Sequence, residues 1–380
     1  MVASLPLDPE LLRAARRPVN EAFSMPAAFY TSPQVFEAEV QHILRKRWIF
    51  LCRTEMLAEP GSYRSFDTAG GPVVLVRSDD GELRAFANFC RHRGSILVEG
   101  EGSARRFVCP YHAWSYTLDG SLSTCPDMQQ AVDFDRSVNG LIPVRLETWN
   151  GFVFINFDDH ASSLLHDLGD LPQRMASHRL DEMVCTWRIS IMNECNWKLI
   201  LENAMESYHT AIVHRETVGR QDSRTLPTTG DWKCIQVISG RSIATLPDTP
   251  PPFPAIEGLD DDARMGTYFT VLHPACQFAV AQDCMWWLNV TPIAADRTLL
   301  EVGGCFPAHV AAEPGFEAKA APYYDRWEKV ALEDVGILEK QQRALASAKY
   351  LPGRLSWRED AVQAVSMWVL DQLQAATQGF

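Results

Sequence analysis

Two Cys–His pairs constrain this chain more than any other feature of its sequence. Cys90-Arg-His92 and Cys109-Pro-Tyr-His112 each follow a strand-like run, and sixteen residues separate His92 from Cys109. Thiolates and imidazoles together suit zinc or an iron–sulfur cluster. Structural zinc sites favour Cys-x₂₋₄-Cys knuckles, whereas Cys and His alternate here, as expected of a [2Fe–2S] centre with two histidine ligands on one iron. A zinc site, or unrelated buried Cys and His residues, are the alternatives.

The residues around these pairs predict a small all-β domain over residues 46–160. Short β-rich runs alternate there with Gly, Pro and Asp turns, and Asp79–Gly81 and Asp119-Gly120 each lie between two such runs. This arrangement is typical of hairpins. Residues 1–45 contain short helical patterns near 9–17 and 33–47, and we expect this lead-in to pack on the remaining part of the chain.

Residues 161–380 mix both periodicities and predict an α+β domain, an antiparallel sheet flanked by helices. A helical pattern at 198–214 follows a strand-like run, and a proline-rich loop occupies 245–266. Three further strand-like runs lie between 276 and 306. Long helical patterns then cover 323–348 and 357–375, so this is the larger of the two domains.

A second set of candidate metal ligands lies in the helical segment. Glu206 and His209 are three residues apart and therefore share a helix face. His214 is five residues beyond His209, which places it about 140° away on an ideal helix. Both histidines can bind one ion only if the helix is distorted or ends between them.

Asp334 is the candidate for a third ligand. It lies on an apolar face of the predicted C-terminal helix, whose members are Trp327, Val330, Ala331, Ile337 and Leu338. A buried carboxylate needs a partner, and either a metal or a buried arginine would serve. Glu333 falls on a wetter face beside Lys329 and Gly336. Two histidines and one carboxylate form the facial triad of non-heme Fe(II) oxygenases.

The two sets in this order resemble the alpha subunits of Rieske non-heme iron oxygenases. The motifs are CRHRG…CPYHAW, NWK…EN…ExYHx₄H and EDx₄ExxQ, and the resemblance runs from about Phe29 to Val369. It implies a [2Fe–2S] Rieske cluster with Cys90 and Cys109 on one iron and His92 and His112 on the other. It also implies a mononuclear Fe(II) held by His209, His214 and Asp334.

The resemblance further implies a head-to-tail homotrimer in which an acidic residue bridges two subunits. Glu206 occupies that position, between an iron-ligand histidine on its own subunit and a cluster histidine on the next. Asn203 is expected to line the iron pocket. Glutamate at this position, followed by Tyr208-His209, is similar to the branch that oxidises quaternary ammonium compounds such as choline, carnitine and betaine. Members of that branch are generally homotrimers without a beta subunit.

We therefore expect monooxygenation or demethylation of a small N-methyl or quaternary-ammonium substrate with O₂. The alternatives are hydroxylation or demethylation of an aromatic substrate, and a Rieske electron carrier whose second domain binds without chemistry. Trp286, Tyr268 and Phe306 are the candidate pocket residues, since aromatic faces bind trimethylammonium groups. Alternation along the strand puts Trp286 and Trp287 on opposite faces of the sheet.

Charge and hydropathy limit the partners. The 35 Lys and Arg residues against 48 Asp and Glu give a net charge of −13, which argues against a general nucleic-acid binder. There is no apolar run of about 18 residues, so we expect no transmembrane helix. The first twenty residues lack the apolar stretch of a signal peptide, which favours the cytoplasm. No G-x-G-x-x-G motif follows a strand, so electrons are expected from a separate NAD(P)H-dependent reductase, with or without a ferredoxin.

Overall fold

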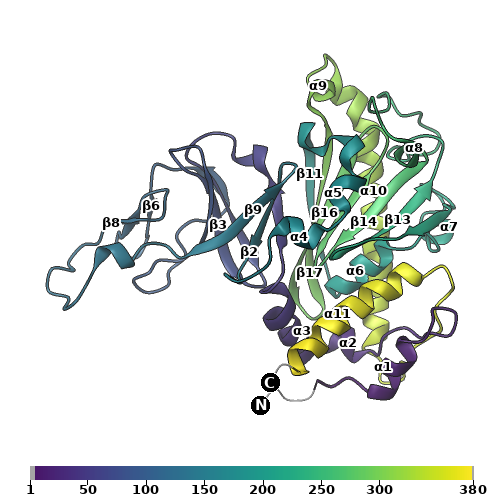
Figure 1. The fold of residues 1–380 in the computed structure, drawn as a ribbon, viewed down its shortest axis with the longest axis horizontal. Coiled ribbons are helices and arrows are strands. Elements are labelled where there is room, and N and C mark those ends of the chain that lie inside the picture. Colours follow the sequence, from purple (N-terminus) through teal and green to yellow (C-terminus); the bar gives the residue numbers. More distant parts are fainter. Residues whose placement is uncertain (1–4, 379–380) are drawn as a thin grey trace. The chain divides into compact units, whose positions relative to one another are not determined.

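The computed structural model describes residues 5–378 and divides into two compact units. One unit is Arg45–Ala161, and the other combines Met1–Leu44 with Ser162–Phe380. The N-terminal segment therefore belongs to the same unit as the C-terminal half (Figure 1). Within the described residues, no helix is both long enough and apolar enough to cross a bilayer.

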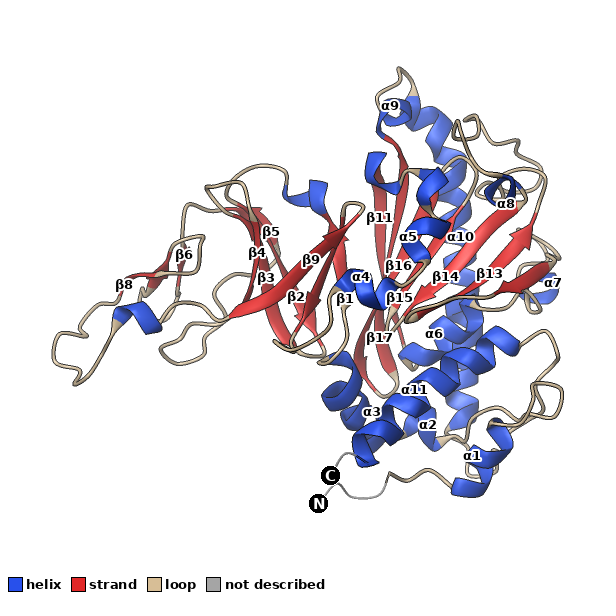
Figure 2. Cartoon of the chain, in the orientation of Figure 1, coloured by secondary structure: helices blue, strands red, loops and turns tan. Residues whose placement is uncertain are grey.

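The unit Arg45–Ala161 contains only strands, loops and short 3₁₀ turns, which confirms the predicted all-β fold (Figure 2). Its main sheet has the order β1-β10-β9-β4-β3-β2-β5 with antiparallel pairing throughout. Its strands are β1 (Ile49–Arg53), β2 (Ser62–Thr68), β3 (Gly71–Arg77), β4 (Leu83–Ala87), β5 (Glu101–Ser103), β9 (Pro143–Trp149) and β10 (Phe152–Asn156). A second, three-stranded sheet comprises β6 (Phe107–Val108), β7 (Ser115–Tyr116) and β8 (Leu122–Thr124).

The larger unit is built on one antiparallel sheet with the order β11-β17-β16-β15-β14-β13-β12. The strands are β11 (Met183–Asn193), β12 (Ser223–Leu226), β13 (Trp232–Ile238), β14 (Gly266–Leu272), β15 (Cys276–Val280), β16 (Met285–Ala294) and β17 (Arg297–Pro307). Helices flank this sheet in Figure 2, as the α+β prediction requires.

The helices are mostly short, except for two near the C-terminus. The short ones are α1 (Pro9–Ala15), α2 (Ala28–Thr31), α3 (Pro33–Glu39), α4 (Leu164–Leu168), α5 (Leu171–Arg174), α6 (Trp197–Ala204), α7 (Thr210–Val213), α8 (Asp261–Arg264) and α9 (Ala308–Ala311). The long ones are α10 (Phe316–Leu345) and α11 (Asp360–Gln378). The helix predicted from residue 323 thus begins at Phe316 and continues through Pro322. The helix predicted at 33–47 is α-helical only to Glu39 and then forms a π-helical turn.

Buried polar contacts fix α6 in place against the N-terminal segment. The side chain of Asn196 caps α6 by accepting from the backbone N–H of Lys198, and its amide donates to the carbonyl of Tyr30 at 3.0 Å. Glu39 accepts from the indole of Trp197 at 2.8 Å and pairs with the buried ammonium of Lys198. These contacts fix the position of the first turn of α6. The helix in turn positions the residues that follow Ala204.

Candidate active site

The Cys–His pairs lie on two loops with the same backbone hydrogen bonds. In each loop the cysteine N–H donates to the carbonyl five residues later, and the N–H four residues later donates back to the cysteine carbonyl. The hydrogen bonds, with the N–H donor named first, are Cys90 to Ser95 at 2.8 Å, Gly94 to Cys90 at 2.9 Å, Cys109 to Trp114 at 2.7 Å and Ala113 to Cys109 at 3.1 Å. The fourth residue after each cysteine is left-handed, with φ of 76° at Gly94 and 58° at Ala113. Each loop thus turns back tightly enough to present a sulfur and an imidazole together.

The donor atoms of these loops, two sulfurs and two imidazoles, suit a [2Fe–2S] cluster. Cys90 and Cys109 are buried, whereas the rings of His92 and His112 are exposed and lie 4.7 Å apart. Trp114 stacks on His92 with ring centres 4.9 Å apart. Burial raises the pKa of the Cys90 thiol, so a thiolate there needs a nearby cation. Such a cation would be an iron of the cluster, which deprotonates its thiol ligands.

The second set of residues lies where the helical segment breaks. The continuous helix predicted over 198–214 is wrong at 205–209, because α6 ends at Ala204 and α7 begins at Thr210. Glu206 stabilises the break: one carboxylate oxygen accepts from the backbone N–H of His209 at 3.0 Å, and the other lies 2.6 Å from Nδ1 of its ring. The break satisfies the condition under which His209 and His214 can face one ion.

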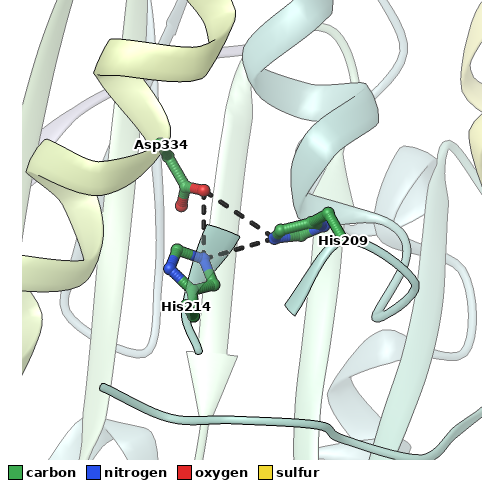
Figure 3. A group of neighbouring side chains, drawn as sticks. All are labelled: His209, His214 and Asp334. Carbon is green, nitrogen blue, oxygen red and sulfur yellow. Dashed lines mark hydrogen bonds and ion pairs between the residues drawn. The ribbon is translucent and has the colours of Figure 1, made fainter. Parts of the chain in front are cut away.

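His209, His214 and Asp334 converge (Figure 3). The Nε2 atoms of the two histidines lie 3.3 Å apart, and Oδ1 of Asp334 is 3.7 Å from Nε2 of His209 and 3.1 Å from Nε2 of His214. These three ligand atoms lie within 4.8 Å of one another. Oδ1 of Asp334 is buried and has no hydrogen-bond donor among the described residues.

The tautomers of the histidines explain why this cluster needs a cation. Nδ1 of His209 faces Glu206, and Nδ1 of His214 lies 2.7 Å from Oε2 of Glu333. A neutral histidine that donates from Nδ1 has a lone pair on Nε2. Two nitrogen lone pairs and one carboxylate oxygen then point at the same space, and a divalent metal fits that arrangement. Burial opposes protonation of His214, but the two carboxylates outweigh it and raise its pKa, so a metal at Nε2 would bind in competition with a proton.

Glu333 was not among the residues predicted for the site. The sequence places it on a wetter helix face, whereas its carboxylate accepts from both His214 and the hydroxyl of Thr217, the latter at 2.7 Å. It lies 119 residues from His214 in the chain. Its position immediately before Asp334, as the first residue of the motif EDx₄ExxQ, is the sequence signal that could have indicated it.

A cavity between the sheet and the helices α6 and α10 leads to this cluster. Asn203 and Trp286 line it, as expected, together with Glu206 and all three convergent residues. Trp287 is not among its lining residues and packs at Gly303. The predicted alternation of the two tryptophans is therefore confirmed.

The structure does not bring Tyr268 and Phe306 to this cavity. Tyr268 faces the opposite side of β14 from its neighbour Phe269, which does line the cavity, and its hydroxyl donates to Asp262 at 2.9 Å. Phe306 is fully buried among other aromatic rings, with Phe253 at 5.2 Å and Tyr323 at 5.1 Å between ring centres. Both side chains contribute to the core of the unit.

Family models match both units. The Rieske [2Fe–2S] domain matches residues 47–146, and the catalytic domain of the ring hydroxylating alpha subunit matches residues 173–375. The second match covers more than half of the chain. The chain belongs to the ring hydroxylating alpha-subunit family. The two domain types bind a [2Fe–2S] cluster and a mononuclear iron, in agreement with the two donor sets described above.

Relatives of this Rieske alpha subunit include enzymes acting on quaternary ammonium compounds. The carnitine monooxygenase oxygenase subunit of Escherichia coli (strain K12) is 39% identical over 198 residues, which is 51% of this chain. That match spans about half of the relative's length, 53%. The glycine betaine monooxygenase oxygenase subunit of Chromohalobacter salexigens is 29% identical over 369 residues, covering 88% of this chain and 82% of the relative.

Solved structures show the same fold. The quaternary ammonium Rieske monooxygenase CntA in complex with L-carnitine has a TM-score of 0.78 and 27% identity, covering 95% of this chain and 98% of that one. Naphthalene 1,2-dioxygenase from Rhodococcus sp. has a TM-score of 0.77, but at 18% identity it supports the fold alone.

Proposed function

We propose that this chain is the oxygenase component of a Rieske monooxygenase that oxidises a small N-methyl or quaternary-ammonium substrate with O₂ and externally supplied electrons. The observation that carries the proposal is the convergence of His209, His214 and Asp334 on one cavity, in a chain that also has the two Cys–His loops. The substrate class is supported by relatives named as carnitine, glycine betaine and choline monooxygenases. Glu206 at the expected bridging position supports the same branch.

The ligands follow from the donor sets. We assign the cluster to Cys90, Cys109, His92 and His112, and the Fe(II) to His209, His214 and Asp334. When bound, the two groups supply electrons and open coordination positions for chemistry with O₂. The chain's own contribution is to hold both imidazoles in one tautomer through Glu206 and Glu333. Asn203 and the apolar cavity walls would position the substrate.

Glu206 is also the residue that we propose to couple two subunits. Its carboxylate holds the Nδ1 proton of His209 within the chain. In a head-to-tail trimer the same carboxylate would contact a cluster histidine of the next subunit, and such a heterologous interface closes into a ring. The solved structure of a quaternary ammonium Rieske monooxygenase, 27% identical to this chain, reveals insights into inter-subunit electron transfer, which supports this arrangement. A separate NAD(P)H-dependent reductase in the cytoplasm would supply the electrons.

A single-turnover experiment tests the proposal. The iron-loaded, pre-reduced protein is exposed to ¹⁸O₂ with a panel of quaternary and N-methyl amines and a panel of aromatic acids and hydrocarbons. We expect ¹⁸O-labelled product, with formaldehyde where an N-methyl group is lost, from the amine panel. Product from arenes alone would support the oxygenase activity but contradict the proposed substrate class. No product from either panel would indicate an electron carrier without oxygenase activity.

A further inference from the structure

Arg326 is a buried cation in the wall of the active-site cavity. It lies on α10, one turn before Val330 and two turns before Asp334, and all three side chains line the cavity. Positions four apart on a helix share a face, so Arg326 and the metal-binding carboxylate open onto the same space. The residue is 3% exposed, and its guanidinium carbon lies 4.8 Å from the ring centre of Trp286.

Arg326 differs from the other buried cations in the described part of the chain. The ammonium of Lys198 pairs with Glu39, and Nε of Arg53 pairs with Glu55 at 3.0 Å. Arg326 has no carboxylate within ion-pair distance in residues 5–378, and its buried Nε has no hydrogen-bond partner there. Burial lowers the pKa of its guanidinium to about 10, so the group is still a cation at neutral pH. A buried charge without a partner is strongly destabilising.

The neighbouring acidic groups do not supply the missing anion. Burial raises the pKa of the Cys284 thiol well above its usual range, so this sulfur is uncharged. The carboxylates of Asp334 and Glu333 are both directed at His214. Glu206 contacts His209. The anion that completes the environment of Arg326 must therefore enter the cavity from outside.

We infer that Arg326 binds a carboxylate of the substrate. The inference rests on the proposed function and narrows it to a zwitterion, with a quaternary ammonium group toward the metal and a carboxylate toward Arg326. A guanidinium presents two parallel N–H groups that match a carboxylate. A substrate that is only a cation, such as choline, would add a second positive charge beside Arg326 with nothing to offset it.

The helix sets the length of this substrate. Eight residues separate Arg326 from Asp334, which corresponds to about 12 Å along the helix axis. Side chains on a helix tilt toward its N-terminus, which does not bring the guanidinium closer to the metal ligands. The spacing favours a longer zwitterion of the γ-butyrobetaine type over glycine betaine. Trp286, whose ring is covered on one side by Arg326, then orients the guanidinium instead of binding the ammonium group.

A pair of ligands tests the inference on the unaltered protein. Binding of γ-butyrobetaine and of its carboxamide, which has the same chain but a neutral tail, is measured by anaerobic calorimetry on the iron-loaded protein. We expect the acid to bind on the order of 10- to 100-fold more tightly, as a charged hydrogen-bonded pair provides. Choline is the third ligand, and we expect it to bind more weakly than the acid.

Variants locate the effect at Arg326. Arg326→Gln is expected to bring the two dissociation constants within about threefold, and to raise KM for the acid more than it changes kcat. Arg326→Lys keeps the charge and is expected to restore part of the preference. Arg188→Gln is the control, because Arg188 pairs with Glu301 and is not among the residues lining the cavity. The cluster absorption and circular dichroism of each variant report its folding.

The possible outcomes distinguish a failure of carboxylate binding by Arg326 from a failure of the proposed function. Equal affinity for acid and amide in the unaltered protein overturns the anchor, even if both compounds are oxidised. Tighter binding of the carboxylate that is lost in Arg326→Gln supports the role of Arg326, even if no ammonium compound is oxidised. The absence of oxidation would overturn the proposed function and not the role of Arg326.

Discussion

Oε2 of Glu333 lies 2.7 Å from Nδ1 of His214, while the adjacent Asp334 faces Nε2 of the same ring. Two consecutive carboxylates on α10 thus contact both nitrogens of one imidazole. The first fixes the tautomer, and the second faces the proposed metal site together with the ring. Residues that orient a metal ligand in this way contribute to metal affinity although they do not touch the metal.

We predict that Glu333→Ala lowers the affinity of the mononuclear site for Fe(II) on the order of 10- to 100-fold. Without the carboxylate, Nδ1 of His214 loses its acceptor and the ring no longer presents Nε2 to the metal in one tautomer. Competition with a chelator measures the affinity, and the cluster spectrum should stay unchanged. Glu328→Ala, at an exposed position of the same helix, is the control. Equal affinity in both variants would show that Glu333 has no role at the site.

Glu206 holds His209 as Glu333 holds His214, so its loss should also weaken Fe(II) binding. We predict that Glu206→Ala, measured at saturating Fe(II), retains both the cluster and the iron but loses coupled turnover. The carboxylate contacts the ring of His209 without being a proposed metal ligand. Its removal should therefore interrupt the proposed electron transfer between subunits. Metal content, the spectrum of the reduced cluster and product formation are measured on the same sample. His209→Ala is the comparison, since it should lose the mononuclear iron and turnover while the cluster spectrum stays intact. Normal product formation by Glu206→Ala would exclude the bridging role.

Glu202 predicts a pH dependence of stability. Burial raises its pKa to about 7, although hydrogen bonds from Ser366 and Tyr30 act in the opposite direction. In the unfolded chain this carboxyl titrates near its ordinary value of 4.5. Between those two values the native state holds a proton that the unfolded state has released, so the free energy of unfolding falls as pH rises.

The loss attributable to Glu202 amounts to about 3 kcal/mol between pH 4.5 and pH 7. Glu202→Gln cannot ionise and should therefore lose less stability than the unaltered protein over that interval. Urea unfolding at several pH values between 4.5 and 7 measures the difference, which should grow with pH in favour of the variant. A difference that stays constant with pH would mean that folding does not raise the pKa of Glu202.

The parts of the site that the sequence predicted are those carried by local spacing. The Cys–His loops and the pair His209 and His214 each lie within a few residues of the sequence. At such short spacing, ligand chemistry allows few types of site. Asp334 is predictable as a candidate ligand because a carboxylate on an apolar helix face needs a partner. The fold class followed from periodicity for the same local reason.

The parts that the sequence could not predict depend on register and on distant contacts. Tyr268 and Phe269 are adjacent, and only the pairing of β14 with its neighbours decides which of them faces the cavity. Glu333 and Arg326 owe their roles to groups brought together by tertiary packing. The missing partner of Arg326, in particular, is visible only once all its neighbours are placed.

Gly304 offers a test of how tightly the cavity wall is packed. A Cβ atom at this position of β17 would lie 1.9 Å from Cζ3 of Trp327, which lines the cavity. We predict that Gly304→Ala displaces the indole and lowers the free energy of unfolding by about 1–3 kcal/mol, the usual cost of overpacking a core.

Gly336→Ala is the matched control: Gly336 lies within α10, and its added Cβ would have no heavy atom within 4 Å beyond the adjacent helix backbone. There, the gain in helix propensity should stabilise the protein by up to about 1 kcal/mol. Urea unfolding of the two variants should therefore give shifts of opposite sign, and a stabilised Gly304→Ala would show that Trp327 can move without cost.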